Sequence, residues 1–169
     1  DRYGRPPLEL LDEIESVLNI ACAPVTWPIG SGQHFEGLYD FNKKAVLPYV
    51  NDENHNDWID LQDLSDDSRF EKGRSDLMDE VELLEGAGNL FKTADFLSGT
   101  VTPVFFGSAL RTFGLKEMLD TFISIAPRPL VRPTNTAPVE PTETSFSAFV
   151  FKVQANMDPK HRDRIAFLR

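Results

Sequence analysis

Residues 101–110 read VTPVFFGSAL, and this stretch decides the fold class. Its first six residues are largely apolar on both faces of an extended chain, a pattern typical of a strand buried in a parallel sheet. The small residues at 107–110 then predict a turn, and apolar residues between 115 and 123 recur at helical spacing. That helix is expected to close before Pro127, since the residue preceding a proline disfavours helical backbone. A strand, a small-residue turn and a helix in succession predict an α/β fold.

The segment that precedes this strand contains further elements. Pro6-Pro7 suits the start of a helix, because N–H groups of the first turn have no partner to lose. Apolar residues at helical spacing continue that helix to Leu18. Residues 23–29 predict a strand that ends in a Gly-Ser-Gly turn, and residues 73–85 predict a helix that Gly86 stops. Helices and strands therefore alternate along the first part of the chain.

The placement of prolines divides the chain into regions. Residues 127–145 hold five of its twelve prolines and many threonines, a composition typical of an extended linker. Residues 146–153 then alternate as a strand with two fairly apolar faces, and residues 165–168 begin another strand. We therefore expect a domain over 1–126, a linker, and the start of a β-domain over 146–169.

Charge and composition limit the classes to which the protein can belong. The net charge of the 169 residues is −10, and residues 51–96 carry all of it, with fourteen acids against four bases. An excess of acidic residues excludes a protein that coats nucleic acid non-specifically, because such a protein needs a positively charged surface. A single cysteine excludes a disulfide framework, and no apolar run approaches the roughly 18 residues of a membrane span. With no signal peptide expected at the N-terminus, we predict a soluble, cytoplasmic protein.

Local motifs for catalysis are weak. The chain contains no phosphate-binding P-loop, and its three histidines lack the spacing of a zinc protease. Residues 51–57 are rich in oxygen ligands but lack the glycine and glutamate of a calcium loop, so a solvated acidic loop is the simpler interpretation. Cys22, beside a strand, is expected to be a small core residue.

The turn at 107–110 resembles the last guanine-recognition box of GTP-binding proteins. In that family the backbone N–H groups of this turn, here those of Ser108, Ala109 and Leu110, bind the guanine oxygen. Asp1, followed by a short loop and an amphipathic helix, is similar to the aspartate of the Asn-Lys-x-Asp box. Its carboxylate would accept hydrogen bonds from the N1–H and exocyclic amine of guanine, a donor pair that adenine lacks.

Longer strings extend the resemblance over nearly the whole chain. Residues 23–32 (APVTWPIGSG) and 35–40 (FEGLYD) resemble the start of the insertion in the GTPase domain of elongation factor G and its relatives. Residues 126–129 (APRP) resemble the link of those factors to their second domain. Residues 149–167 (FVFKVQANMDPKHRDRIAF) are similar to the opening of the second domain in the bacterial peptide chain release factor 3 family, where elongation factor G has a different string.

This resemblance implies a translational GTPase that acts in translation termination. The full factor would bind GTP or GDP with magnesium, promote the departure of class-one release factors from the ribosome, and leave after hydrolysis. The P-loop, switch regions and magnesium ligands of the family have no counterpart here, so we expect an internal piece. It would comprise the C-terminal half of a P-loop-type GTPase domain, with an insertion at about 30–96, and the start of a β-barrel. Such a piece would hold no catalytic residue, no bound cofactor and no GTPase activity.

Basic residues near the C-terminus are a second implied site. Residues 146–169 carry a balance of +3 from five bases and two acids. Within them we expect contacts with ribosomal RNA or protein from Lys160, His161, Arg162 and Arg164; a solvated hairpin tip is the simpler alternative.

Two other function classes and one further property stay open. The chain could belong to an elongation factor G-like translocase, although the string at 149–167 argues against it. It could instead be a nucleotide-independent interaction module that offers the acidic residues of 35–96 to a basic partner, although a charge run is most often a solvated face. We also expect self-association, because the truncated sheet leaves strand edges without partners.

Overall fold

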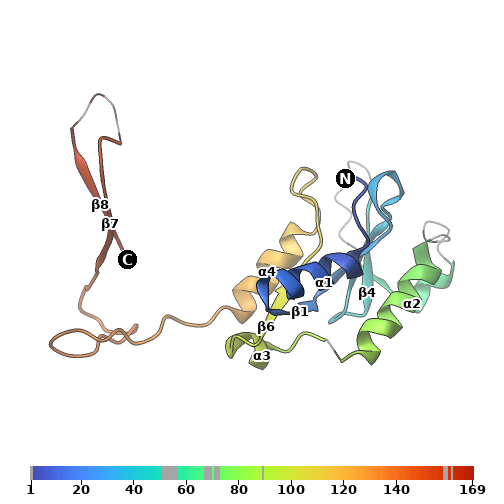
Figure 1. Cartoon of the computed structure of the whole chain (residues 1–169), viewed down its shortest axis with the longest axis horizontal. Helices are drawn as coiled ribbons and strands as arrows, with labels where there is room; N and C mark the ends of the chain where they lie inside the picture. Colours follow the sequence, from blue (N-terminus) through green and yellow to red (C-terminus); the bar gives the residue numbers. More distant parts are fainter. Residues whose placement is uncertain are drawn as a thin grey trace. The chain divides into compact units, whose positions relative to one another are not determined.

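The computed structural model describes residues 2–50, 57–66, 70, 73–88, 90–157, 160 and 162–169. The chain forms two compact units, Asp1–Ala126 and Pro127–Arg169. The first unit combines helices with a parallel strand pair and an antiparallel sheet, and the second holds a two-stranded hairpin (Figure 1). The mixed α/β class predicted from the sequence is therefore confirmed.

The stretch at 101–110 begins with one strand of a parallel pair. β6 (Val101–Val104) pairs in parallel with β1 (Ala21–Pro24), and Ala21 lies opposite Val101. β1 is buried from Cys22 onward, whereas β6 is mostly half-buried. The predicted parallel direction is confirmed, but the predicted burial of β6 is not complete. The reason is that β1 is the one strand paired with β6 in the described part of the chain.

Three helices accompany this strand pair. α1 (Pro7–Leu18) contacts β1, and its last turn is closed by Asn19 in the left-handed conformation, with φ of 53°. α3 (Thr93–Leu97) contacts β6, and α4 (Leu115–Ile125) follows the turn after β6. The predicted start at Pro7 and the predicted end of α4 before Pro127 are confirmed. None of the described helices is long and apolar enough to cross a membrane.

A four-stranded antiparallel sheet occupies the middle of the first unit. Its strands lie in chain order: β2 (Thr26–Ile29), β3 (Gly37–Asp40), β4 (Ala45–Pro48) and β5 (Ile59–Asp60). The single strand predicted over residues 23–29 is wrong, because the chain leaves β1 at Val25 and enters a different sheet. The Val25 N–H still donates to the Val104 carbonyl, at 2.8 Å, while Thr26 already pairs with Asp40.

Two 3-10 turns and one longer helix complete the first unit. The 3-10 turns are η1 (Gly32–His34) and η2 (Asp63–Asp66), and α2 (Gly73–Gly86) lies against β2. The predicted helix over 73–85 is therefore confirmed, with Gly86 as its last residue.

The core of the first unit joins the antiparallel sheet to α2 and α1. Trp27 is fully buried, and Cys22 is a free, buried cysteine, as expected for a small core residue. Each large apolar side chain buried in this way contributes about 1.5–3 kcal/mol relative to exposure. The core side chains are Leu11, Cys22, Trp27, Ile29, Tyr39, Phe41, Val46, Leu64, Phe70, Leu77, Val81 and Leu84.

The second unit is a single hairpin preceded by irregular chain. β7 (Val150–Ala155) pairs antiparallel with β8 (Arg164–Leu168), with an irregularity between Val150 and Lys152. Before it, Arg132 and Val139 exchange two backbone hydrogen bonds that close a loop in the proline-rich stretch. In the described residues this unit has two strands and forms no barrel.

Candidate functional site

The turn that follows β6 is closed by its own backbone. The Ser108 N–H donates to the Phe113 carbonyl at 2.9 Å, and the Phe113 N–H donates back to the Ser108 carbonyl at 3.1 Å. The Ser108 hydroxyl Oγ accepts a further hydrogen bond from the Arg111 N–H, at 3.2 Å. Residues 108–113 are thus a fixed loop, with the serine side chain used to hold its shape.

Glycines stand at both ends of this loop because side chains would collide there. A Cβ at Gly107 would lie 2.7 Å from the Phe113 carbonyl oxygen. Gly114 has φ of +78°, and a Cβ there would lie 2.7 Å from Leu38 Cδ1 and 2.8 Å from the Phe106 carbonyl oxygen. Only glycine tolerates both the close approach and the positive φ. The glycine at 107 therefore belongs to the turn's geometry as well as to the resemblance.

Two adjacent backbone donors point to the chemistry of the turn. The N–H groups of Ala109 and Leu110 donate no hydrogen bond to any described part of the chain. Both residues are exposed, whereas Ser108 is half-buried and its N–H is already used. A carbonyl oxygen is the natural ligand for such donors, and an amino group is rejected because it also donates. Guanine carries an oxygen and adenine an amino group at the same ring position.

The N-terminal segment lies beside the same turn. A pocket of about 400 Å³ is lined by Arg2 and Gly4 from this segment and by Gly107 and Ser108 from the turn. Asp1, the predicted partner of the turn, lies outside the described residues. Its neighbour Arg2 lines the pocket together with Ser108, which is one of the predicted site residues.

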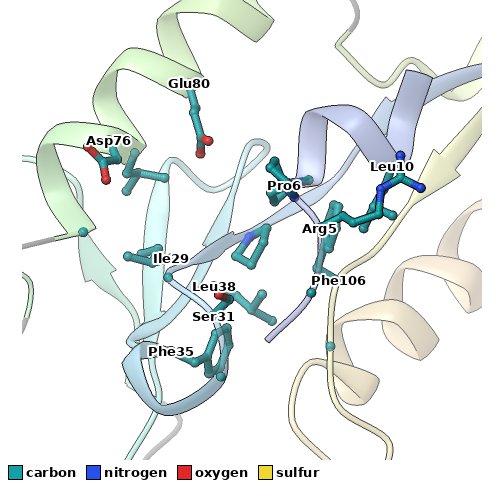
Figure 2. Close-up of a pocket in the computed structure, with 18 of the residues that line it drawn as sticks. Arg5, Pro6, Leu10, Ile29, Ser31, Phe35, Leu38, Asp76, Glu80 and Phe106 are labelled. Carbon is teal, nitrogen blue, oxygen red and sulfur yellow. The ribbon is translucent and has the colours of Figure 1, made fainter. Parts of the chain in front are cut away.

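The walls of this pocket differ in charge. Arg5 and Leu10 belong to the wall at the start of α1, and Asp76 and Glu80 come from α2 on the other side (Figure 2). Arg5 is exposed and forms a salt bridge to Glu13 at 2.6 Å. Its hydrogen bond to Glu9, and after it the negative charge of Glu13, raise the pKa of the Arg5 guanidinium. The guanidinium is therefore always charged.

Glu80 has a structural partner. Its Oε2 accepts a hydrogen bond from the indole Nε1–H of the buried Trp27, at 2.6 Å. That contact joins α2 to β2.

Thr26 is a contributor to the turn that the sequence did not reveal. Its Oγ1 accepts a hydrogen bond from the Phe106 N–H at 2.9 Å and lies 3.4 Å from the Phe106 carbonyl. A buried threonine in an otherwise apolar strand was the available signal, but its partner is eighty residues away. Nothing in the local pattern identifies such a partner.

The cysteine and the side chains of metal-binding types are further reactive groups among the residues that the structure describes. Burial, and after it the Glu15 carboxylate, raises the pKa of the Cys22 thiol, so it stays protonated and a poor nucleophile. Among the described residues no three side chains of the metal-binding types lie close enough to hold an ion. The acidic loop at 51–57 lies outside the described residues except for Asp57.

The predicted basic site belongs to the second unit. Arg164 begins β8 and is paired with Ala155, and Arg162 precedes it in the connection between the two strands. Lys160 lies in a turn of the same connection, and His161 lies outside the described residues. The hairpin therefore carries the three described bases in the connection between its strands and at the start of β8.

Comparison with known proteins shows that the fold of this chain is similar to part of a solved structure. No family model matches the chain. Among solved structures, a crystal structure of a protein from Thermus thermophilus is similar, with a TM-score of 0.54 and 21% sequence identity. The match covers 98% of this chain and 25% of that one, so this chain spans about a quarter of the neighbour's length.

Proposed function

We propose that this chain is part of a translational GTPase of the peptide chain release factor 3 type, and that its turn at 107–114 binds the guanine base. The observation that carries the proposal is the pair of adjacent N–H groups at Ala109 and Leu110, which have no acceptor in the described part of the chain and lie in the turn that follows the carboxyl end of a parallel strand. Nucleotides bind at the carboxyl ends of strands in open α/β sheets.

The finer assignment of the fold is also part of this proposal. The first unit is the C-terminal half of a GTPase domain, and its insertion at about 30–96 contains β3, β4, β5 and α2. The hairpin of the second unit is the start of a translation-factor β-barrel. Support comes from the parallel β1–β6 pair, the strings at 23–40 and 149–167, and the quarter-length match to a longer chain. GTP and magnesium would be held largely by parts of the full factor outside this chain.

Nucleotide affinity of the full-length protein tests the proposal. Calorimetric titration should give tighter binding of GDP than of ADP. Asp1→Asn should weaken GDP binding by about 1–3 kcal/mol, the usual range for a charge-assisted hydrogen bond left unmade. The loss should be smaller for inosine diphosphate, which lacks the exocyclic amine. Asp12→Asn, which removes an exposed acid on α1, is the matched control. Equal affinity for GDP and ADP would refute guanine binding.

Activity on the ribosome separates termination from elongation. The full-length protein should accelerate departure of a class-one release factor from terminated ribosomes in a GTP-dependent manner. Acceleration of tRNA translocation instead would favour the elongation factor G-like alternative.

An acidic interaction module is the second candidate, and α2 favours it. This helix carries one base, Arg74, and five acids, of which all but Glu80 are exposed. The acids are Asp76, Asp79, Glu80, Glu82 and Glu85. A basic protein partner fits such a face. A full-length protein that binds a basic partner in a salt-sensitive manner, with no affinity for guanine nucleotides, would support this candidate over the GTPase.

A further inference from the structure

We propose that the antiparallel sheet β2–β5 holds the guanine-binding turn in its recognition geometry, with Thr26 and Phe113 as positioning residues. This inference rests on the proposed function. It adds that guanine affinity depends on how this sheet holds the backbone of the turn.

Thr26 fixes the entrance to the turn. It is fully buried, and its hydroxyl serves the backbone of Phe106, the last residue before Gly107. In the described part of the chain the Phe106 N–H has no other acceptor, because β6 and its pairing with β1 end at Val104. The hydroxyl replaces the missing strand partner, and without it a half-buried N–H would be left without a hydrogen bond.

Phe113 fixes the exit of the turn. Its ring packs edge-on against Phe35 at 5.7 Å and Tyr49 at 5.2 Å between ring centroids, and those two rings lie 5.3 Å apart. Phe35 follows η1 and Tyr49 follows β4, so both belong to the antiparallel sheet and its loops. The carbonyl of Phe113 is the acceptor for the Ser108 N–H. The aromatic cluster therefore positions the backbone bond that closes the loop.

A third contact lies between these two. Leu38 of β3 is fully buried, and its Cδ1 occupies the space beside Gly114 where a Cβ would stand. Leu38, Phe35 and Phe106 lie around the same pocket (Figure 2). Phe106, Phe113 and Gly114, at the two ends of the loop, therefore each contact side chains of the antiparallel sheet or of its loops.

This arrangement fixes the direction of the free donors. Ala109 and Leu110 are exposed, and Leu110 retains 79% of its accessible surface. The positions of their N–H groups therefore follow from the backbone at 106–108 and 113–114 and from two hydrogen bonds inside the loop, Thr112 N–H to the Ala109 carbonyl and Arg111 N–H to Ser108 Oγ. A small displacement at either end tilts both donors, and hydrogen bonds weaken steeply with angle.

The test compares Thr26→Val with Thr26→Ser in the full-length protein. Valine keeps the shape of the side chain without the hydroxyl, and serine keeps the hydroxyl. The ligands are GDP and the diphosphate of thioguanosine, in which sulfur, a weak acceptor, replaces the guanine oxygen. We expect Thr26→Val to weaken GDP binding by about tenfold, the size of one lost hydrogen bond, and the thio analogue by less than about twofold. Thr26→Ser should stay within about twofold of the wild type for both ligands.

Equal losses for GDP and the thio analogue, or an unchanged GDP affinity, would overturn the positioning role while leaving the proposed function intact. A wild type with no preference for GDP over ADP would overturn the proposed function itself. Circular dichroism checks that each variant folds. If Thr26→Val does not fold, Phe113→Leu and the conservative Phe113→Tyr decide the question with the same two ligands, because the ring of Phe113 is only half-buried.

Discussion

Replacement of Trp27 by phenylalanine tests how α2 is held on the antiparallel sheet. Trp27 is fully buried, and its indole N–H donates to Glu80 at 2.6 Å. Its ring also lies edge-on to Phe106, at 5.3 Å between centroids, and to Phe41. Phenylalanine keeps an aromatic ring among these neighbours but removes the donor. Trp27→Phe therefore addresses one hydrogen bond between β2 and α2, with a modest reduction in packing.

The expected loss of stability follows from the acceptor's charge. A hydrogen bond to a charged group contributes about 1.5–3 kcal/mol, and Glu80 is half-buried, so water recovers part of it. We expect Trp27→Phe to lower the free energy of unfolding by about 2 kcal/mol. For a chain of this size that corresponds to a fall in Tm of about 4–8 °C.

Thermal and urea unfolding of the whole chain measure this loss. Trp58 remains in the variant as a fluorescent reporter within the first unit, where Lys43 lies 3.7 Å from the centroid of its ring. Glu80→Gln is the matched control, since its amide oxygen still accepts the hydrogen bond. A double-mutant cycle with Glu80→Ala isolates the coupling. If Glu80→Ala costs as much in the Trp27→Phe background as in the wild type, the hydrogen bond does not hold α2.

Two further predictions concern association. The isolated chain should self-associate, because α4 exposes Phe122 and Ile123, at 58% and 74%; Ile123→Lys should reduce the mass measured by light scattering across a dilution series, and Ser124→Lys should not. A stable monomer at every concentration would refute this. Charge reversal at Lys160 and Arg162 should weaken ribosome binding by the full-length protein and lower its salt slope by about 0.7–0.9 for each phosphate that is no longer neutralised; an unchanged slope would refute binding through these bases.

The helices could be predicted from the sequence because their ends are marked locally. Pro7 begins α1 with a backbone angle already suited to a helix, and Gly86 ends α2. The break at Val25 could not be predicted, since an apolar, β-branched residue suits either sheet. Its position is set by two distant partners: Val104 accepts from the Val25 N–H, and Asp40 pairs with Thr26. The sheet that a strand joins is therefore determined by residues far away in the sequence.

The same division holds at the candidate site. The turn at Ser108 could be predicted from small residues adjoining a strand, because its hydrogen bonds close within six residues. Thr26 and the rings around Phe113 could not, since each contact joins residues far apart in the chain. The predicted role of Asp1 stays a prediction, because that residue lies outside the described part.

The position of the turn follows from how the two sheets meet. The parallel pair ends at Val104, and the chain of β1 turns away at Val25 into the antiparallel sheet. Beyond that point β6 has lost its strand partner, so each following N–H needs another acceptor or stays free. Thr26 supplies one acceptor for Phe106, and the loop itself supplies one for Ser108. The next two N–H groups, of Ala109 and Leu110, are exposed and have no acceptor among the residues that the structure describes. An oxygen atom of a ligand would accept hydrogen bonds from these two N–H groups. The carboxyl end of the strand is where such a ligand can approach.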